Sequence, residues 1–288
     1  MRILKRKKGN YDYYYLQHSF RLKGKVITRE KYIGKTLPKD IDKVKRDFKR
    51  EILPDLYNRL EAIQKDFQKD WGKLPKSIKD KQQQELAITF TYHTNAIEGS
   101  TISEAEVRGI ILDKISPGKS LKDIKEAEAH NNVFLEMLEQ GRPLSNSLLL
   151  EWHKKMFNQT KSEIAGKYRN YNVRVGSHIA PNYEEVTELM DQLIKFIQTN
   201  KDEINPVEIS AIGHYRFEKI HPFGDGNGRI GRLLMNHILW YSGYPVLIIE
   251  YKNRNAYYTA LERDEDGFTG YFFKRYLKVH GKKYKNSN

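Results

Sequence analysis

The segment from His221 to Arg232 constrains the fold of this chain most strongly, because it places a glycine-rich turn between two helical patterns. Apolar residues follow it at helical spacing and predict a helix that begins near Asn227. Those residues are Ile230, Leu233, Leu234, Ile238 and Tyr241. A second helical pattern precedes the segment, opened by Asn205 as N-cap and Pro206 at the first helical position. The segment therefore joins two helices.

The side chains of this segment suit the binding of a phosphate chain. Backbone N–H groups at a glycine-rich helix start can close on an anion, and the helix dipole favours negative charge there. Arg229 and Arg232 lie three residues apart on one face, where they can clamp phosphate oxygens. Asp225 offers a hard oxygen ligand to a divalent cation, and His221 can take a proton from a nucleophile. The sequence predicts a nucleotide-handling site.

Two simpler interpretations of the glycines compete with this one. Gly226, Gly228 and Gly231 have the spacing of a dinucleotide-binding fingerprint, but that fingerprint requires a preceding strand, and here a helical pattern precedes it. A glycine-rich connector with solvated charges would explain the glycines alone. It leaves unexplained why an imidazole, a carboxylate and two guanidiniums gather with them. We therefore favour phosphate binding.

The same residues resemble the signature of the Fic (filamentation induced by cyclic AMP) family, His-x-Phe-x-Asp/Glu-Gly-Asn-Gly-Arg-x-x-Arg, and fill every defined position. The resemblance implies a mainly α fold, a Fic-type helical bundle with a β-hairpin flap. It also implies transfer of AMP from ATP to a protein hydroxyl. Gly228 follows the transferase pattern, because a kinase-like branch of the family carries Lys at that position.

The resemblance further implies a role for each signature residue. His221 would be the catalytic base, Phe223 a buried anchor of the loop, and Asp225 the ligand of Mg²⁺ against the α- and β-phosphates. The residues implied to contact ATP are Asn227, Gly226, Gly228, Arg229, Arg232 and Tyr257. Of two adjacent tyrosines, Tyr257 is assigned to the adenine and Tyr258 to the core.

A second motif lies N-terminal to the signature, in a helix predicted near residues 81–99. Glu98 in its last turn opposes the helix dipole, which predicts a cationic partner, and Arg232 is a candidate. Beside the signature, the stretch from Thr94 to Gly99 resembles the family's inhibitory motif, Ser/Thr-x-x-x-Glu-Gly/Asn. The resemblance implies that Glu98 pairs with Arg232 and keeps ATP from seating its γ-phosphate productively. In some relatives this Glu also takes part in removing AMP.

Between Gly166 and Pro181 the pattern changes from helical to alternating, which predicts a short β-hairpin. This stretch resembles the flap on which Fic proteins dock a target polypeptide as an added strand. The flap residues are Val175, Gly176, Ser177, His178 and Ile179. A hairpin that only covers a loop is the simpler alternative.

The start of the chain differs from the rest. Strand-favouring residues from Tyr11 to Leu22, and again from Val26, predict a β-hairpin broken at Lys23–Gly24, with a third short strand as an option. Basic residues among the tyrosines could bind nucleic acid by stacking, but an amphipathic sheet on the helical body is the favoured interpretation. The predicted divisions are an N-terminal hairpin (1–38), a helical segment with the inhibitory helix (39–110), the Fic catalytic core (111–265), and a C-terminal helix with a basic tail (266–288).

Composition bounds the partners. The absence of cysteine excludes disulfides and cysteine-bound zinc, and favours a reducing, cytoplasmic setting. No apolar run approaches a membrane span, and the N-terminus lacks a signal peptide's apolar stretch, so no membrane partner is expected. The formal net charge of +14 would attract ATP, acidic proteins or nucleic acid.

Three functions remain open from the sequence. The favoured one is an adenylyltransferase that modifies a Ser, Thr or Tyr hydroxyl of a target protein, inhibited by Glu98; self-modification and a homodimer are compatible with it. The second is a basic nucleic-acid-binding regulator with a vestigial Fic site. The third is a Fic enzyme that uses another nucleotide or phosphate-containing donor.

Overall fold

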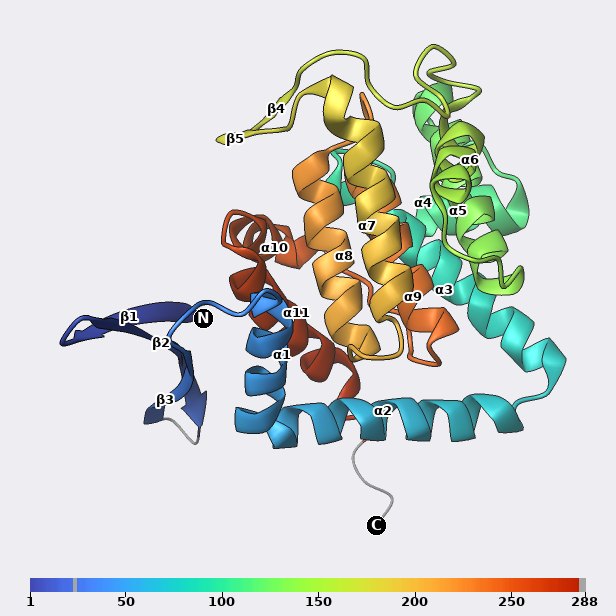
Figure 1. The fold of residues 1–288 in the computed structure, drawn as a ribbon. Helices are drawn as coiled ribbons and strands as arrows, with labels where there is room; N and C mark the ends of the chain where they lie inside the picture. The colour runs from blue at the N-terminus through green and yellow to red at the C-terminus, as the bar shows by residue number, and fades with distance from the viewer. Residues whose placement is uncertain (23–24, 285–288) are drawn as a thin grey trace. The chain divides into compact units, whose positions relative to one another are not determined.

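The computed structural model describes residues 1–22 and 25–284, and they form two compact units, Met1–Glu61 and Ala62–Asn288 (Figure 1). The division falls within helix α2 (Pro54–Lys73), whereas the sequence predicted the end of the N-terminal part at residue 38. The difference arises because helix α1 (Ile41–Ile52) joins the N-terminal sheet. Lys31 of the sheet pairs with Glu51 of α1 at 2.6 Å.

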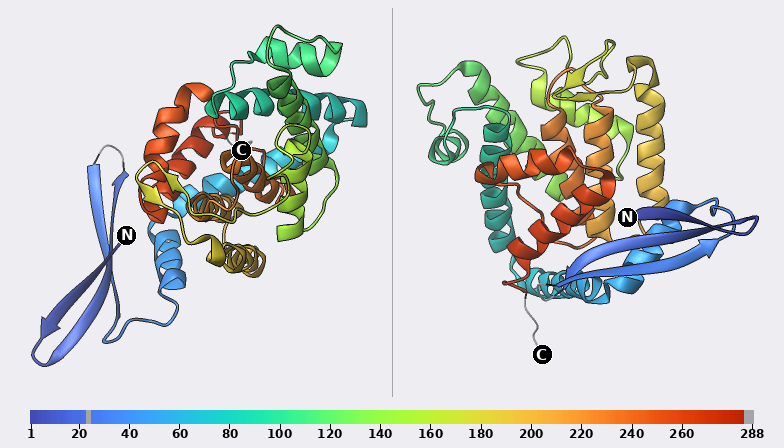
Figure 2. Two further views of the ribbon diagram at one scale, coloured as in Figure 1. Left: turned by 90° about the horizontal axis from the view of Figure 1, so that it is seen from above. Right: turned by 90° about the vertical axis from the view of Figure 1, so that its left-hand side faces the viewer.

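The N-terminal sheet has three antiparallel strands in the order β1-β2-β3, drawn in Figure 2 as a narrow twisted ribbon. They are β1 (Arg2–Lys8), β2 (Tyr11–Leu22) and β3 (Lys25–Gly34). The optional third strand is thus β1, a highly basic stretch with weak strand propensity of its own. Its pairing with the tyrosine-rich β2, from Arg2 opposite Gln17 to Lys8 opposite Tyr11, supplies the stability. The predicted break at Lys23–Gly24 lies outside the described residues.

The remaining chain is mainly helical, as predicted, and contains a short hairpin of strands β4 (Arg174–Val175) and β5 (His178–Ile179). Its longer elements are α3 (Lys76–Ile97), α4 (Glu104–Arg108), a π-turn η1 (Gly109–Asp113), α5 (Leu121–Glu139), α6 (Asn146–Phe157), α7 (Val186–Asn200), α8 (Pro206–Ile220), α9 (Asn227–Tyr241), α10 (Arg254–Leu261) and α11 (Glu265–His280). Two short 3-10 turns, η2 (Tyr183–Glu185) and η3 (Tyr251–Asn253), precede α7 and α10. Helix α3 begins directly after Pro75, earlier than the predicted start near residue 81.

Local capping explains where the helices of the site begin. The side chain of Asn205 accepts a hydrogen bond from the backbone N–H of Val207, and Pro206 follows as the first helical residue of α8. Helix α9 begins at Asn227, as predicted, after Gly226 in a left-handed conformation. The two helices lie against each other and are joined by the signature segment (Figures 1 and 2).

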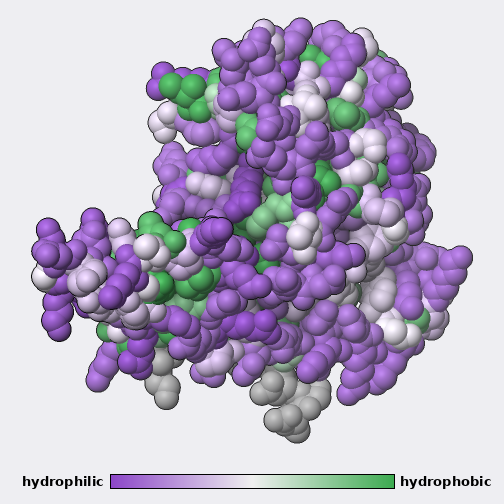
Figure 3. Space-filling view, in the orientation of Figure 1, coloured by the Kyte–Doolittle hydropathy of each residue, from purple (hydrophilic) through white to green (hydrophobic). Residues whose placement is uncertain are grey.

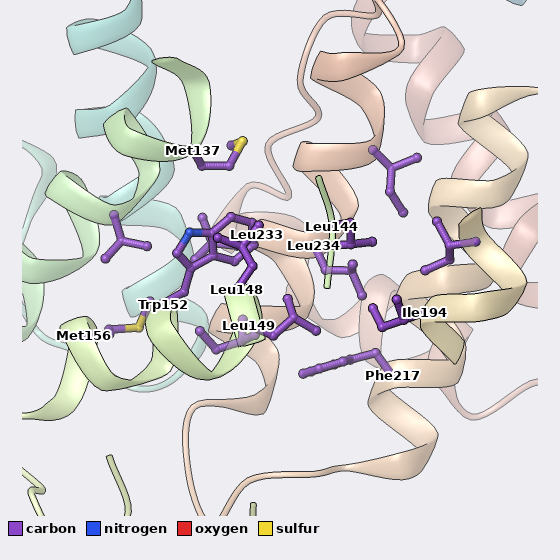
Figure 4. Close-up of a cluster of buried hydrophobic side chains, with 14 of the residues drawn as sticks. Met137, Leu144, Leu148, Leu149, Trp152, Met156, Ile194, Phe217, Leu233 and Leu234 are labelled. Carbon is purple, nitrogen blue, oxygen red and sulfur yellow. The ribbon is translucent and has the colours of Figure 1, made fainter. Parts of the chain in front are cut away.

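The core surrounds α8 and α9. Leu233 and Leu234 of α9 are fully buried and lie near Trp152 of α6 and Phe217 of α8 (Figure 4). Burial of a Leu or Phe side chain contributes about 1.5–3 kcal/mol, so this core fixes α9 firmly. The start of α9, where the signature arginines lie, is consequently a rigid platform.

The surface is mainly polar. In the face drawn in Figure 3, hydrophilic residues predominate and hydrophobic ones are scattered between them. Within residues 1–22 and 25–284, no helix combines the length and the apolar character required to cross a bilayer.

Candidate active site

The signature loop is anchored at Phe223. This side chain is fully buried and stacks on the imidazole of His153, with 3.9 Å between the ring centroids. His153 in turn holds the loop through Nε2, which lies 3.0 Å from the Asp225 carbonyl oxygen. Burial lowers the pKa of His153 to about 4, so it is a neutral structural group at physiological pH.

Asn227 closes the loop on itself. Its side-chain oxygen accepts a hydrogen bond from the Phe223 N–H, and its amide group donates to the Phe223 carbonyl, both at 2.8 Å. The side chain is 2% exposed. The resemblance assigned Asn227 to a phosphate contact; here its side-chain polar atoms serve the loop backbone instead.

Two glycines are required by close packing. A side chain at Gly226, whose φ is +78°, would begin 2.4 Å from the ring of Phe157. A side chain at Gly228 would overlap with an oxygen of Glu98, 2.2 Å from its Cβ, and with a nitrogen of Arg232, 2.9 Å from it. The glycine at 228 therefore leaves room for an acidic group beside the first turn of α9.

Arg232 and Glu98 form an ion pair across 134 residues of sequence. The Arg232 Nη2 donates to the Glu98 carboxylate at 2.7 Å, and its Nε donates to the Thr94 hydroxyl at 3.2 Å. The arginine side chain is 1% exposed and that of Glu98 is 32% exposed. Burial alone would lower the pKa of the guanidinium, but the nearby carboxylate of Glu98 raises it above its ordinary value. The structure thus brings together the two residues that the motifs predicted as partners.

Glu98 lies at the C-terminal end of its helix. It is the C-cap residue of α3, followed by Gly99 with φ +94°. Its carboxylate faces the start of α9, where N–H groups and the dipole attract negative charge. An acidic side chain therefore stands where the sequence predicted a phosphate.

Arg229 has a different set of partners, which the sequence did not reveal. Its Nη1 donates to Glu126 of α5 at 2.5 Å, and its Nη2 lies 3.4 Å from Asp225. Lys161 bridges the same carboxylates, at 3.0 Å from Glu126 and 2.5 Å from Asp225. Burial alone would raise the pKa of Glu126, but the two cations lower it below its ordinary value.

Asp225 is the candidate metal ligand, and it is the only carboxylate of the signature segment. Within residues 1–22 and 25–284, no group of three or more His, Asp or Glu side chains converges on one point. Mg²⁺ commonly binds through one or two carboxylates, with waters and substrate phosphates completing the octahedron. The donors present therefore fit Mg²⁺ only together with a nucleotide.

His221 terminates α8 in a left-handed conformation with φ +51°. Burial lowers the pKa of its imidazole below the ordinary value, so the ring is neutral and able to accept a proton near pH 7. The carbonyl of His221 accepts a hydrogen bond from the Nε of Arg169 at 2.8 Å. The backbone at the candidate base is therefore held from outside its own helix.

Arg169 connects the base to the predicted flap, and the sequence did not single it out. Its Nη2 donates to the Pro181 carbonyl at 2.7 Å and its Nη1 to the Tyr171 carbonyl at 2.8 Å. The guanidinium, 4% exposed, is thus engaged by backbone oxygens of two segments. The alternation of polar and apolar residues between Gly166 and Pro181 does not distinguish a buried cation from a solvated one.

The predicted flap is a two-stranded hairpin, β4 (Arg174–Val175) and β5 (His178–Ile179), closed by Gly176 and Ser177. Gly176 has φ +59°, as a tight turn requires. The Nε2 of His178 lies 2.9 Å from the Lys219 carbonyl, two residues before His221. Ile179 is 72% exposed, so its side chain is available to another molecule.

The two adjacent tyrosines are reversed relative to the prediction. Tyr257 is 1% exposed, and its hydroxyl lies 2.8 Å from the Nε2 of His214 in the core. Tyr258 is 42% exposed and donates to the Ile97 carbonyl at 2.9 Å. Neighbouring residues of a helix point about 100° apart, and two tyrosines give no sequence signal as to which faces inward. Tyr258, not Tyr257, is the tyrosine available to a base.

A further carboxyl group lies beneath the signature helix. Glu218 of α8 is directed at Gly231, where a side chain would begin 2.7 Å from its oxygen. Burial raises its pKa to about 7, with partial compensation by Arg232. Sequence reasoning did not mark this residue, because its environment comes from the packing of α8 on α9.

Comparison with known proteins agrees with these features. The Fic/DOC family profile matches residues 143–239. The "Protein adenylyltransferase Fic" of Nematostella vectensis is 34% identical over 189 residues, 64% of this chain and 44% of that protein. The "Protein adenylyltransferase fic-1" of Caenorhabditis elegans is also 34% identical, over 62% of this chain and 36% of that protein. This chain therefore spans less than half the length of these curated relatives.

Two solved structures share the fold. A Fic-1 fragment from Caenorhabditis elegans superposes with a TM-score of 0.70 at 27% identity, over 82% of this chain and 73% of that one. A Fic domain containing signaling protein from Bacteroides thetaiotaomicron gives 0.67 at 26% identity, over 81% of this chain and 95% of that one. Residues 143–239 contain the signature segment and match the family profile, so they form a Fic domain of the Fic/DOC family.

Proposed function

We propose that this chain is a protein adenylyltransferase that moves AMP from ATP to a Ser, Thr or Tyr hydroxyl of a target protein and is held inactive by its own Glu98. The observation that carries the proposal is the acidic side chain of Glu98 at the start of α9, bonded to Arg232 at 2.7 Å. The names of the curated relatives support the reaction class. We place the catalytic core within residues 111–265, with the inhibitory group supplied from helix α3.

The chemistry requires one base and a stabilised leaving group. The neutral imidazole of His221 takes the proton of the target hydroxyl as that oxygen forms a bond to the α-phosphorus. The bond from the α-phosphorus to the bridging oxygen breaks, and pyrophosphate leaves with the electron pair. Because phosphoryl-type transfer depends mainly on positioning and charge, the protein must hold the phosphates in line with the hydroxyl.

The phosphates would lie at the start of α9. The N–H groups near Gly228 face the α-phosphate, and Arg232 and Arg229 neutralise the charge that develops on pyrophosphate. Mg²⁺, when bound between Asp225 and the phosphates, would add further neutralisation of the leaving group. Asn227 contributes by keeping the loop closed around Phe223.

Inhibition would be a competition for Arg232. Its guanidinium now donates to Glu98 and to Thr94, so a γ-phosphate must displace the carboxylate to gain the same donors. Two anions in one position also repel each other. ATP would therefore bind poorly or with its phosphates misplaced while Glu98 is seated, and any signal that withdraws Glu98 from α9 would activate the enzyme.

The flap would hold the target. Within the described residues this sheet consists of β4 and β5 alone, so each strand keeps an outer edge that no other strand pairs with and to which an extended peptide can add. Val175 and Ile179 are exposed at 40% and 72% and would contact its side chains. Arg169 ties the base of this hairpin to His221, so a docked hydroxyl and the base would keep a fixed separation.

The test uses ATP labelled at either end of the phosphate chain. The Glu98→Gly variant, incubated with Mg²⁺ and a mixture of acceptor proteins, should transfer label from α-labelled ATP and none from γ-labelled ATP. His221→Ala in the same background should transfer neither. Transfer of the γ label would identify a kinase and overturn the proposal, as would label transfer that persists without the imidazole.

A further inference from the structure

One face of the N-terminal sheet gathers tyrosines and cations. Residues directly opposite each other in antiparallel strands project to the same face, and the pairs here are Tyr11 with Lys8, Tyr13 with Arg6, and Tyr15 with Tyr32. We call the face with these six residues the tyrosine face. Strand alternation places it opposite the face that carries Lys31, whose ammonium group contacts α1.

The rings of the tyrosine face are accessible. Tyr11 is 59% exposed and Tyr32 is 50% exposed, unusually open for aromatic side chains. Tyr32 also touches both Tyr13 and Tyr15, with centroids 6.2 and 5.3 Å apart, so the rings form one connected platform. Exposed apolar rings are unfavourably hydrated and add nothing to a core. Such a group of rings on a surface is typical of a binding site.

Cations accompany the rings at close range. The Lys35 ammonium group lies 4.4 Å from the centre of the Tyr11 ring, and the Arg6 guanidinium 4.6 Å from that of Tyr15. Arg6 is held in place by Glu30, at 2.8 Å. A cation thus lies beside the rings of Tyr11, Tyr13 and Tyr15.

The charge of the chain is concentrated in this unit. Residues 1–61 contain 18 Lys and Arg against 8 Asp and Glu, which leaves 33 against 29 for the rest of the chain. The N-terminal unit therefore carries +10 of the total +14. The catalytic proposal does not need this charge, because its phosphate-binding groups all belong to the other unit.

We propose that the tyrosine face binds single-stranded nucleic acid. Aromatic rings on the open face of a small antiparallel sheet stack with bases, and adjacent cations neutralise the backbone phosphates. The combination distinguishes this ligand from its competitors. A membrane-binding surface typically sets Trp, Phe or Leu beside its cations, and none of these is among the six residues of the tyrosine face. The proposal is independent of the AMP-transfer activity.

The experiment measures binding of the full chain to a fluorescein-labelled oligothymidylate of about twelve nucleotides by anisotropy, at about 50 to 200 mM salt. Replacing both Tyr11 and Tyr32 with Ala should weaken binding by about tenfold or more, because stacking on two rings is lost. Replacing both with Phe keeps the rings and should preserve the affinity. Label transfer from ATP by each variant, in the Glu98→Gly background, checks that the protein is intact.

Charge is tested separately. Lys8→Gln combined with Lys35→Gln should reduce the slope of log affinity against log salt by about 1.4, because each phosphate contact on a single strand contributes about 0.7. The matched control is Lys195→Gln with Lys201→Gln, which removes the same charge from exposed positions of the other unit and should leave the slope nearly unchanged. Equal losses in the two pairs, tighter binding to a duplex of the same length, or an unaltered affinity of the Ala variant would each overturn the proposal.

Discussion

Arg229 and Arg232 lie one turn apart on α9 and each pairs with a glutamate from another helix, but the two glutamates are held differently. Glu126 comes from the middle of α5, its side chain is 9% exposed, and two cations contact it. Glu98 comes from the end of α3, its side chain is 32% exposed, and one guanidinium contacts it. Both side chains of the Glu126–Arg229 pair are therefore buried, whereas in the Glu98–Arg232 pair the glutamate is partly exposed to solvent.

The difference separates a permanent contact from a reversible one. Withdrawal of Glu126 would leave the buried Arg229 and the half-buried Lys161 with Asp225 as their remaining carboxylate partner, at a cost of several kcal/mol. Glu98 lies at the end of α3 with its side chain partly exposed, and after its withdrawal Arg232 would keep its bond to Thr94 and could bind water or a phosphate instead. Two similar ion pairs on one helix can therefore have different functions: Glu126 holds Arg229 in place, and under the proposed function Glu98 would regulate access to Arg232.

The largest expected effect is on stability. Glu126→Gln should lower the free energy of unfolding by about 3 kcal/mol, because Arg229 and Lys161 lose the more buried of the two carboxylates that they share. For a unit of this size the midpoint of thermal unfolding should fall by about 10 °C. Glu98→Gln should cost only about 1 kcal/mol, since a partly exposed hydrogen-bonded pair is lost. Calorimetry of both variants measures the difference.

Glu128→Gln is the matched control, because Glu128 lies on the same helix and the substitution removes the same charge. It should shift the midpoint by no more than about 1 °C, as expected for a surface change. Equal destabilisation by the Glu126 and Glu98 variants would contradict the distinction between an enclosed and a displaceable pair.

The next effect is on nucleotide affinity. In a His221→Ala background, which prevents turnover, Glu98→Gly should tighten the binding of Mg²⁺–ATP by about tenfold, equivalent to 1.4 kcal/mol, because Arg232 becomes available. Glu126→Gln should not tighten it. Titration calorimetry supplies the affinities, and AMP, which lacks the outer phosphates, should show no such gain.

The third effect is a pH dependence of stability, and it concerns Glu218, which belongs to neither of the two ion pairs. Because burial raises the pKa of Glu218 to about 7, its bound proton stabilises the fold below the unfolded value and that contribution is lost as pH rises through about 7. Glu218→Gln should therefore increase the free energy of unfolding by about 3 kcal/mol near pH 9 and by less than about 1 kcal/mol near pH 5.

Arg232, Glu98, Lys219 and His214 are the charged and titratable groups that surround Glu218. Urea unfolding across this pH range makes the measurement. A Gln variant that is less stable at high pH would show instead that the carboxylate is ionised and paired, which would make it a second competitor for Arg232.

The smallest effect should come from Tyr258. Its hydroxyl donates to the carbonyl of Ile97, the residue before Glu98, and so restrains the end of α3. Tyr258→Phe removes that bond and should raise basal label transfer by about twofold, in line with a hydrogen bond worth about 0.5 kcal/mol. Initial rates of label transfer by the wild-type chain and Tyr258→Phe measure this effect. A lower rate for the variant would indicate that the hydroxyl binds the substrate.

The sequence predicted features that depend on local patterns. The start of α9 at Asn227, the cap at Asn205 and the hairpin at residues 174–179 follow from spacing and turn residues. The Glu98–Arg232 contact was predicted from the agreement of two motifs, which no periodicity would have supplied. That contact and the helical fold are present in the structure.

Features that depend on packing were missed. Glu126 and Lys161 lie 103 and 64 residues from their signature partners, and a charged residue in a helix gives no indication that it faces a core. The tyrosine assignment failed for the same reason. The third strand was predicted only as an option, without its position, because the basic side chains of β1 conceal its pairing with β2. Each miss concerns an environment created by distant segments.

The central claim is that Glu98 alone withholds Arg232 from the triphosphate, and the ratio of initial rates of transfer from α-labelled ATP tests it directly. At a fixed ATP concentration, Glu98→Gly should exceed the wild-type chain by about a hundredfold, equivalent to about 2.7 kcal/mol, and Glu98→Gly with Arg232→Ala should lose that gain. Equal rates for the wild-type chain and Glu98→Gly, with both active and both dependent on His221, would contradict the account.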